Sequence, residues 1–203
     1  NTTNIDVLTH NDKLSIHHCK NITKISLSDH PRREVLLSAC SNLQEITIAG
    51  KVGKIQLYIC RNLLQISLLE KVNSLSIEEA DSLINLSNVQ YVQSIELLLC
   101  EHLLEISPLS QVKSLEINEC LSLTTIKSLQ YLESLIISCA GELRTIEDLP
   151  LLKELEIGDC FHLEKLMNLP LCQNYQLNLY NDQLHRLEVV NCPGYVRREV
   201  EED

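Results

Sequence analysis

Residues 115–134 read LEINECLSLTTIKSLQYLES, and residues 135–154 read LIISCAGELRTIEDLPLLKE. The two stretches place Leu115 over Leu135, Ile117 over Ile137 and Ile126 over Ile146. The Leu-x-Ile step is typical of a short strand whose middle residue faces outward. The later apolar residues follow at steps of three, which suit 3₁₀ turns or extended corners better than an α-helix or a long strand. The stretch therefore predicts one twenty-residue turn of a repeating coil.

This unit recurs along most of the chain. From Val35 to Leu155 the apolar-x-apolar segments begin every 20 residues. They begin at Leu14, Val35, Ile55, Leu75, Ile95, Leu115, Leu135 and Leu155. A fixed period of this length indicates a solenoid, because a single coil cannot bury its apolar side alone and must stack on its neighbours. We predict one parallel sheet of short strands, a 3₁₀ or irregular outer side, and few or no α-helices.

The composition agrees with a core that is filled the same way many times. Apolar residues make up 44% of the chain, but aromatic residues only 3%, with no Trp. Irregular globular cores usually contain several large rings. A core of Leu, Ile and Val favours a regular repeat.

The motif L-x-x-L-x-I-x-x-C-x-x-L, as in Leu152-Lys-Glu-Leu155-Glu-Ile157-Gly-Asp-Cys160-Phe-His-Leu163, resembles the leucine-rich repeat. The resemblance extends from about residue 5 to residue 192. Cys at the usual Asn position, and the closing Cys192-Pro193, resemble repeats of plant intracellular immune receptors. The resemblance implies a right-handed leucine-rich-repeat solenoid with its parallel sheet on the concave side. The twenty-residue unit is shorter than in most members of the family, and the chain contains no nucleotide-binding region.

We expect one domain over residues 1–203: a partial N-terminal turn at 1–13, repeats over 14–191 forming about nine to ten turns in all, and a cap or charged, solvated tail at 192–203. Two places break the period. Leu14 and Val35 are 21 residues apart, and residues 28–33 (SDHPRR) are expected to bulge. Leu187-Glu-Val189 follows Tyr175-Gln-Leu177 after only 12 residues, as if the last unit had lost its outer arc. Ile5 and Leu8 occupy outer-arc positions, so we expect a fragment or a missing N-terminal neighbour.

Nine cysteines are present, and most share one inward repeat position. Cys19, Cys40, Cys60, Cys100, Cys120 and Cys160 hold it, Ala80 replaces one, and Cys139 is placed there one residue early. Adjacent strands lie within disulfide range, but parallel side chains bridge poorly. We therefore expect buried free thiols beside backbone carbonyls, with one or more disulfides as the alternative. Cys172 lies outside this pattern.

The net charge of −11, from 28 acidic and 17 basic residues, disfavours binding to nucleic acid or to an anionic membrane. We expect no cofactor and no metal, because His17, His18 and Cys19 fall on a strand exit and cannot converge on one ion. His102 and His162 are expected at the surface. The five glycines form no phosphate-binding motif, and no hydrolase or zinc-protease signature occurs. We predict that the chain is not an enzyme.

The outward positions of the predicted concave face carry the functional argument. They combine acidic side chains with large apolar ones, and we single out Tyr58, Ile59, Glu78, Glu96, Leu98, Glu116, Asn118, Ile136 and Glu156 as binding residues. Glu79, Glu119 and Asp159 extend the acidic run, and Leu99 the apolar set. An acidic run is often only a solvated surface, but clustered exposed apolar groups mark contact sites.

These residues predict a monomeric, non-enzymatic recognition or scaffold module that binds a protein with a basic and apolar surface. It could serve as the sensor or targeting part of a longer protein. The alternatives are a secreted or cell-surface adhesive repeat protein, or the targeting domain of an enzyme whose catalytic part is absent. The expected free thiols favour the cytoplasm. The sequons at Asn1, Asn21 and Asn85 leave a secreted protein open.

Overall fold

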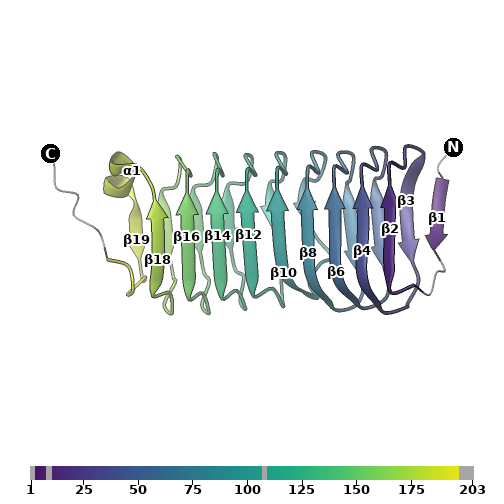
Figure 1. Cartoon of the computed structure of the whole chain (residues 1–203). Helices are drawn as coiled ribbons and strands as arrows, with labels where there is room; N and C mark the ends of the chain where they lie inside the picture. Colours follow the sequence, from purple (N-terminus) through teal and green to yellow (C-terminus); the bar gives the residue numbers. More distant parts are fainter. Residues whose placement is uncertain (1–2, 8–10, 107–108, 197–203) are drawn as a thin grey trace.

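The structure is a computed structural model and describes residues 3–7, 11–106 and 109–196. It is a parallel β-solenoid of about nine turns with one short helix (Figure 1). The expectation for Leu8 and that for the tail after residue 196 lie outside the described residues. The predicted repeat solenoid is confirmed. No helix in the described ranges is long and apolar enough to cross a membrane.

A nine-stranded parallel sheet runs the length of the solenoid, and we call it the long sheet. Its strands follow one another in chain order, one strand from each coil. They are β2 (Lys13–His17), β4 (Arg32–Ser38), β6 (Val52–Tyr58), β8 (Val72–Glu78), β10 (Val92–Leu98), β12 (Ser114–Asn118), β14 (Ser134–Ser138), β16 (Glu154–Gly158) and β18 (Asn174–Asn178). Ile95, Leu115 and Leu135 lie side by side. The twenty-residue period is therefore the register of the sheet.

The outer side differs from the expected 3₁₀ or irregular chain, because it also forms short parallel strands. They make sheets of four, two and four strands. The strands are β1 (Thr3–Val7), β3 (Ile22–Leu27), β5 (Glu45–Ile48), β7 (Gln65–Leu68), β9 (Asn85–Leu86), β11 (Glu105–Ile106), β13 (Thr125–Lys127), β15 (Thr145–Glu147), β17 (Lys165–Met167) and β19 (Glu188–Val190). In-register coils let neighbouring backbones pair here too, which satisfies groups that a buried irregular arc would leave unpaired.

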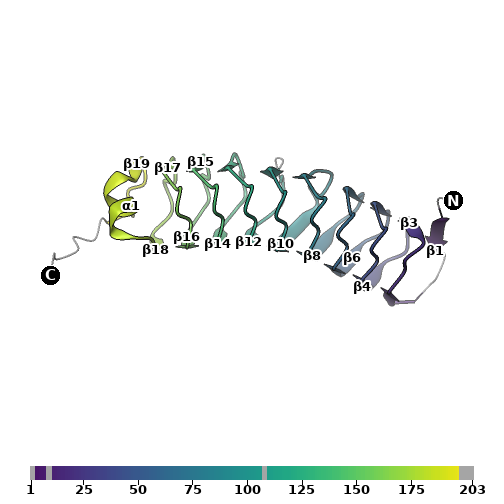
Figure 2. The ribbon, with the colours of Figure 1, turned by 90° about the horizontal axis from the view of Figure 1, so that it is seen from above.

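The two layers enclose one continuous aliphatic core, and the long sheet follows the inner side of a shallow bend (Figure 2). In the coil that begins at Leu115, all seven apolar positions are buried, from Leu115 and Ile117 through Cys120 and Leu123 to Leu132. Burying an aliphatic side chain stabilises the fold by roughly 1.5–3 kcal/mol. Each coil contributes the same layer, so stacking extends the core without large rings.

The strands of the long sheet end at what we call the upper corner, where the chain turns through a left-handed residue after each of the eight strands from β2 to β16. The residues are His18, Ala39, Ile59, Glu79, Leu99, Glu119, Cys139 and Asp159, with φ between 52° and 54°. Their N–H groups donate to the next coil, as in Ile59 N to Glu78 O at 2.9 Å. The inward cysteine that follows donates its thiol to the carbonyl two residues before it, as in Cys60 Sγ to Tyr58 O at 3.6 Å.

All nine cysteines carry free thiols, as expected. The assignment of Cys139 to the inward position was wrong: Ala140 is buried there, and Cys139 is the half-exposed left-handed residue. Cys172 also has a place in the fold. It fills the core position that Val112, Leu132 and Leu152 hold in earlier coils. Burial raises the pKa of the Cys160 thiol to about 11.

The predicted break between Leu14 and Val35 falls at what we call the lower corner, the turn that leads into each strand of the long sheet. Four residues, 28–31, join β3 to β4, whereas three, 49–51, join β5 to β6. Gly50 packs against this longer turn, because a Cβ there would come within 2.4 Å of the His30 carbonyl oxygen. Buried Arg32 replaces the usual core valine and donates to the carbonyls of Ser28 (3.2 Å) and His30 (3.0 Å).

The C-terminal coil departs from the sequence expectation. Leu187-Glu-Val189 does not start a further strand of the long sheet, because β19 pairs with β17 on the outer side. Helix α1 (Asn181–Arg186) occupies the upper corner between β18 and β19. The last coil has therefore kept its outer arc and exchanged its upper turn for a helical one.

Candidate functional site

The outward side chains of the long sheet form an open surface, which we call the sheet face. Because side chains alternate along a strand, each strand presents its inward aliphatic pair to the core and its other residues to this face. In-register pairing aligns these outward residues into columns across the coils. Glu96, Glu116, Ile136 and Glu156 form one column on β10, β12, β14 and β16. Tyr58, Glu78, Leu98 and Asn118 form the next column on β6 to β12.

Glu96, Glu116 and Glu156 form what we call the acidic stripe, and all three side chains are exposed. Glu96 and Glu116 are direct neighbours on paired strands. Like charges opposite each other destabilise a sheet. Within the described part of the chain, no Lys, Arg or His lies within ion-pair distance of these three carboxylates. The stripe is thus a run of negative charge without a counter-ion.

Apolar side chains lie within and beside the stripe. Ile136, between Glu116 and Glu156, is 36% exposed. Tyr58 and Leu98 are half-buried in the neighbouring column. Ile59 differs from the expectation of a strand position, since it lies at the upper corner, but it is 40% exposed. The structure therefore brings the predicted residues to one side of the solenoid, with Ile59 at its edge.

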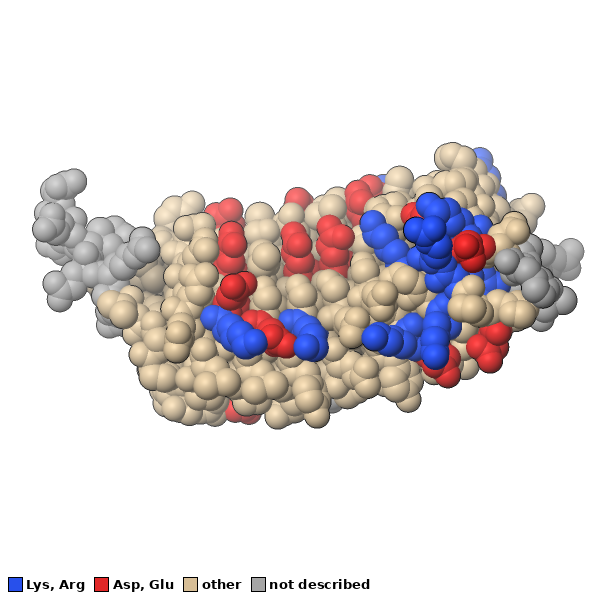
Figure 3. Space-filling view, turned by 60° about the horizontal axis from the view of Figure 1, so that its bottom comes forward, with Lys and Arg blue, Asp and Glu red and all other residues tan. Residues whose placement is uncertain are grey.

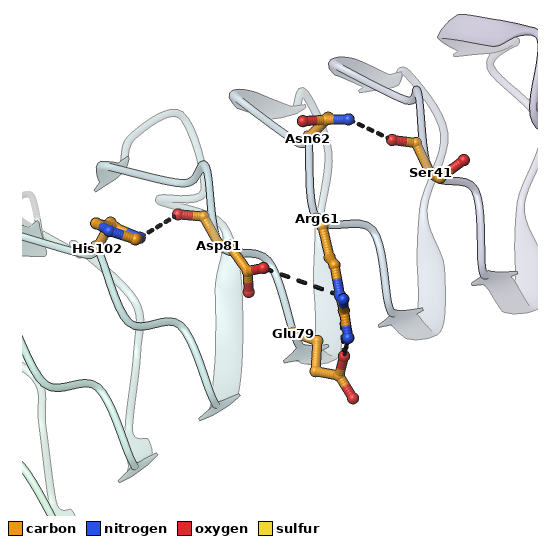
Figure 4. Close-up of polar contacts among 6 residues, drawn as sticks. All are labelled: Ser41, Arg61, Asn62, Glu79, Asp81 and His102. Carbon is orange, nitrogen blue, oxygen red and sulfur yellow. Dashed lines mark hydrogen bonds and ion pairs between the residues drawn. The ribbon is translucent and has the colours of Figure 1, made fainter.

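Glu79 is a correction to the predicted acidic run. Its carboxylate accepts a hydrogen bond from Arg61 Nε at 3.2 Å, and Arg61 also lies 3.9 Å from Asp81 (Figure 4). The side chain of Asn62 donates to the Ser41 carbonyl at 2.6 Å, and His102 donates from Nδ1 to the Asp81 carbonyl at 2.9 Å. Glu79 therefore belongs to a polar network that joins coils at the upper corner, and its charge is neutralised.

The histidines occupy separate structural positions. His17 and His18 are exposed at the end of β2, and His162 donates from Nδ1 to the Gly141 carbonyl at 2.6 Å, as His102 does to Asp81. In the described ranges no group of three or more His, Cys, Asp or Glu side chains is arranged to hold a metal ion. His102 and His162 serve as links between successive coils.

A cavity of about 340 Å³ lies at the C-terminal end. It is lined by Tyr175, Leu177, Leu184 and Tyr195, and the two tyrosine rings meet edge to face with centroids 5.6 Å apart. Burial raises the pKa of the Tyr175 hydroxyl, which also lies beside Cys172 and Cys192. The lining side chains are uncharged.

The sequence analysis missed a group of basic side chains on the N-terminal coils. Figure 3 shows many Lys and Arg gathered there, while the middle and C-terminal coils on the same side carry separate rows of Asp and Glu, with some Lys or Arg beside them. The cations are Arg33, Lys51, Lys54 and Lys71, all exposed, and we call them the basic patch. The signal was present in the sequence as an uneven distribution of charge, but the net value of −11 concealed it.

No protein-family model matches the sequence, and the comparison with curated proteins found no match.

Proposed function

We propose that this chain is a leucine-rich-repeat recognition module that binds a protein partner on the sheet face. The repeat motif and the solenoid support the architecture. The observation that carries the function is the acidic stripe. Among the described residues no cation pairs with Glu96, Glu116 or Glu156, and Glu116 and Glu156 flank the exposed Ile136. Repulsion between neighbouring carboxylates destabilises the free protein. A partner whose cations neutralise these carboxylates would explain why the stripe is present.

The partner on this proposal carries basic and apolar side chains. Its Lys or Arg groups would lie against the stripe, and its apolar groups against Leu98 and Ile136. Charge of this kind mainly raises the association rate and selects the partner. The apolar contacts supply the tighter part of the complex, because buried apolar anchors near the centre of an interface dominate its energy.

Large apolar side chains also occupy the left-handed turns at Ile59 and Leu99. A left-handed conformation costs an ordinary L-residue roughly 1–2 kcal/mol, and β-branched residues adopt it least readily. Asn, Asp or Gly would turn the corner more easily. Large apolar side chains are held there all the same, beside Tyr58 and Leu98. The same φ recurs at the upper corner of seven other coils, so the conformation belongs to the fold. What favours contact with a partner is the apolar side chain of Ile59, which is 40% exposed.

The experiment compares Glu96→Lys/Glu116→Lys with the control Glu101→Lys/Glu105→Lys. The control makes the same change of net charge at the upper corner and on outer strand β11. The probe is a fluorescent twelve-residue peptide of alternating Lys and Leu, followed by anisotropy. We expect the first variant to lose at least about tenfold in affinity, or about 1.4 kcal/mol, with a thermal midpoint almost equal to that of the wild type. Equal binding by both variants would place the contact elsewhere.

A further inference from the structure

Charge is divided along the axis of the solenoid. Residues 11–71 contain nine Lys and Arg against five Asp and Glu, whereas residues 72–196 contain six against eighteen. Most of the acidic excess therefore belongs to the coils from β8 onward. Charges farther apart than about 8 Å are largely screened at physiological salt. A bound segment consequently experiences the local charge of each half, and the net charge of the molecule matters little.

The cations of the basic patch form no close ion pair with a described residue. Within the described residues, Arg33, Lys51, Lys54 and Lys71 have no carboxylate within ion-pair distance. Lys54 Nζ donates instead to a neutral group, the Gln56 amide oxygen, at 3.2 Å. This bond forms in the amide orientation that gives both the oxygen and the nitrogen of Gln56 a suitable partner. Their acidic neighbour Glu34 is bound to Lys13 at 2.8 Å. Lys13, then Lys54 and Arg33, lower the pKa of Glu34.

Cations farther along the solenoid behave differently. Lys113 and Lys153 both bind Glu133, at 3.0 Å and 2.5 Å, and Arg144 binds Glu164 at 2.7 Å. Lys165 is likewise bound to Glu188 of the next coil at 3.3 Å, whereas Lys127 and Arg186 form no ion pair with a described residue. In the basic patch, four cations lie on neighbouring coils without such ion pairs. The acidic stripe has the same property with negative charges.

Figure 3 shows Lys and Arg on the N-terminal coils and Asp and Glu on the following coils of one side of the molecule. Lys54 of the patch and Glu96 of the stripe both project from the long sheet, because each is next to a buried isoleucine, Ile55 or Ile95. Parallel strands are about 4.8 Å apart, so the six steps from β4 to β16 cover roughly 29 Å, and an extended segment of about nine residues spans them. The patch itself covers the three coils of β4, β6 and β8, or roughly 10 Å. A short acidic segment fits this length. A longer polyanion, such as a nucleic acid, would continue onto the acidic coils and be repelled.

We propose that the basic patch binds an acidic segment of the same protein partner whose basic segment lies on the acidic stripe. This inference rests on the proposed function. The partner segment is charge-segregated, acidic at one end and basic at the other, and it lies along the solenoid axis in one direction only. The two patches together select the order of charges in the partner, which neither could do alone.

Two peptides of identical composition test this directly. One carries four Glu, a Gly-Ser linker of four residues and four Lys in separate blocks, and the other alternates the Glu and Lys. We expect the block peptide to bind at least about fivefold more tightly at low salt, because only it matches both patches. In Lys51→Glu/Lys54→Glu/Lys71→Glu the advantage should vanish. The control Lys20→Glu/Lys24→Glu/Lys127→Glu changes the net charge equally and should retain it.

The Lys-Leu peptide separates this proposal from the proposed function. Suppose that the Lys-Leu peptide binds the Lys51/Lys54/Lys71 variant and the wild type equally, and that the wild type does not prefer the block peptide to the alternating one. The proposed function of the acidic stripe would then stand, and the inference about the basic patch would fail. The neutral variant Lys51→Gln/Lys54→Gln/Lys71→Gln checks that any loss is not unfolding. Tighter binding of an oligonucleotide than of the block peptide, or salt-sensitive self-association abolished by the triple variant, would also overturn it.

Discussion

The left-handed residues at the upper corner are set by the backbone and only weakly by residue type. The turn has φ near 53° after each of the eight strands from β2 to β16, and the residues there are His, Ala, Ile, Glu, Leu, Cys and Asp. The outer side behaves differently. Its left-handed positions are Asn88, Ser128, Asp148, Asn168 and Asn191, which are small and polar. Asn168 donates to Asp148 Oδ1 at 2.7 Å and accepts from Asn191 Nδ2 at 3.1 Å. Local sequence therefore favours the outer turn, whereas stacking imposes the upper one.

Glu119→Asn is expected to stabilise the protein by about 0.5–1 kcal/mol, because Asn adopts the left-handed conformation more readily than Glu. Glu119 is exposed, so little packing is lost. Chemical denaturation measures the change. Asp159→Asn is the matched control, since it removes one negative charge at the same repeat position from a residue that already tolerates the turn. An equal gain in both variants would assign the effect to charge and contradict this account.

Most strands of the long sheet could be predicted, because the alternating apolar residues indicate each strand and their fixed spacing gives its register with the next. Outer strands β13, β15 and β17 could not, since three residues with one buried side chain carry no period of their own. Outer strands β5 and β7 do alternate, at Ile46-Thr-Ile48 and Ile66-Ser-Leu68, and the sequence analysis missed that signal. Cys139 was misplaced because a buried Ala at residue 140 looks the same as any small residue, and only the turn geometry distinguishes the two positions. Arg32 was expected in a bulging loop, but it lies in the core, where its Nη1 donates to the carbonyls of Ser28 and His30.

Glu133 is the centre of an ion-pair ladder that ties three neighbouring coils together. Lys153 and Lys113 lower its pKa from 4.5 to about 2. A depressed folded-state pKa stabilises the fold above the unfolded-state pKa, and this contribution is lost as pH falls from 4.5 toward 2. Carboxyl-carbon NMR titration should show Glu133 titrating near 2, and Lys113→Met/Lys153→Met should return it toward 4.5. A wild-type Glu133 that titrates near 4.5 would show that the lysines are not bound in solution.

On the scale of the whole molecule, the sequence predicted which residues lie on the sheet face better than it predicted which of their charges are unpaired. The outward columns follow from the period, so Glu96, Glu116, Ile136 and Glu156 could be chosen without a structure. The sequence could not predict which of these charges form ion pairs. Glu79 and Arg61 are 18 residues apart and meet because one coil separates them, whereas Glu96 meets no cation. Pairing between coils depends on side-chain reach at each corner, and the period alone does not fix it.

Stability should also be distributed along the solenoid, because each coil contacts mainly its neighbours. Ile16 and Ile117 occupy the same column of the long sheet, but Ile16 is partly exposed on edge strand β2 and Ile117 is fully buried on β12. We expect Ile117→Ala to cost about 3 kcal/mol, within the range for buried Ile, and Ile16→Ala about 1 kcal/mol, because it loses less buried area. Denaturant unfolding measures both. Hydrogen exchange should show Ile117→Ala accelerating exchange in β10, β12 and β14, and Ile16→Ala only in β2 and β4. Equal losses of unfolding free energy in the two variants, or hydrogen exchange accelerated uniformly along the chain, would mean that the coils unfold as a single cooperative unit.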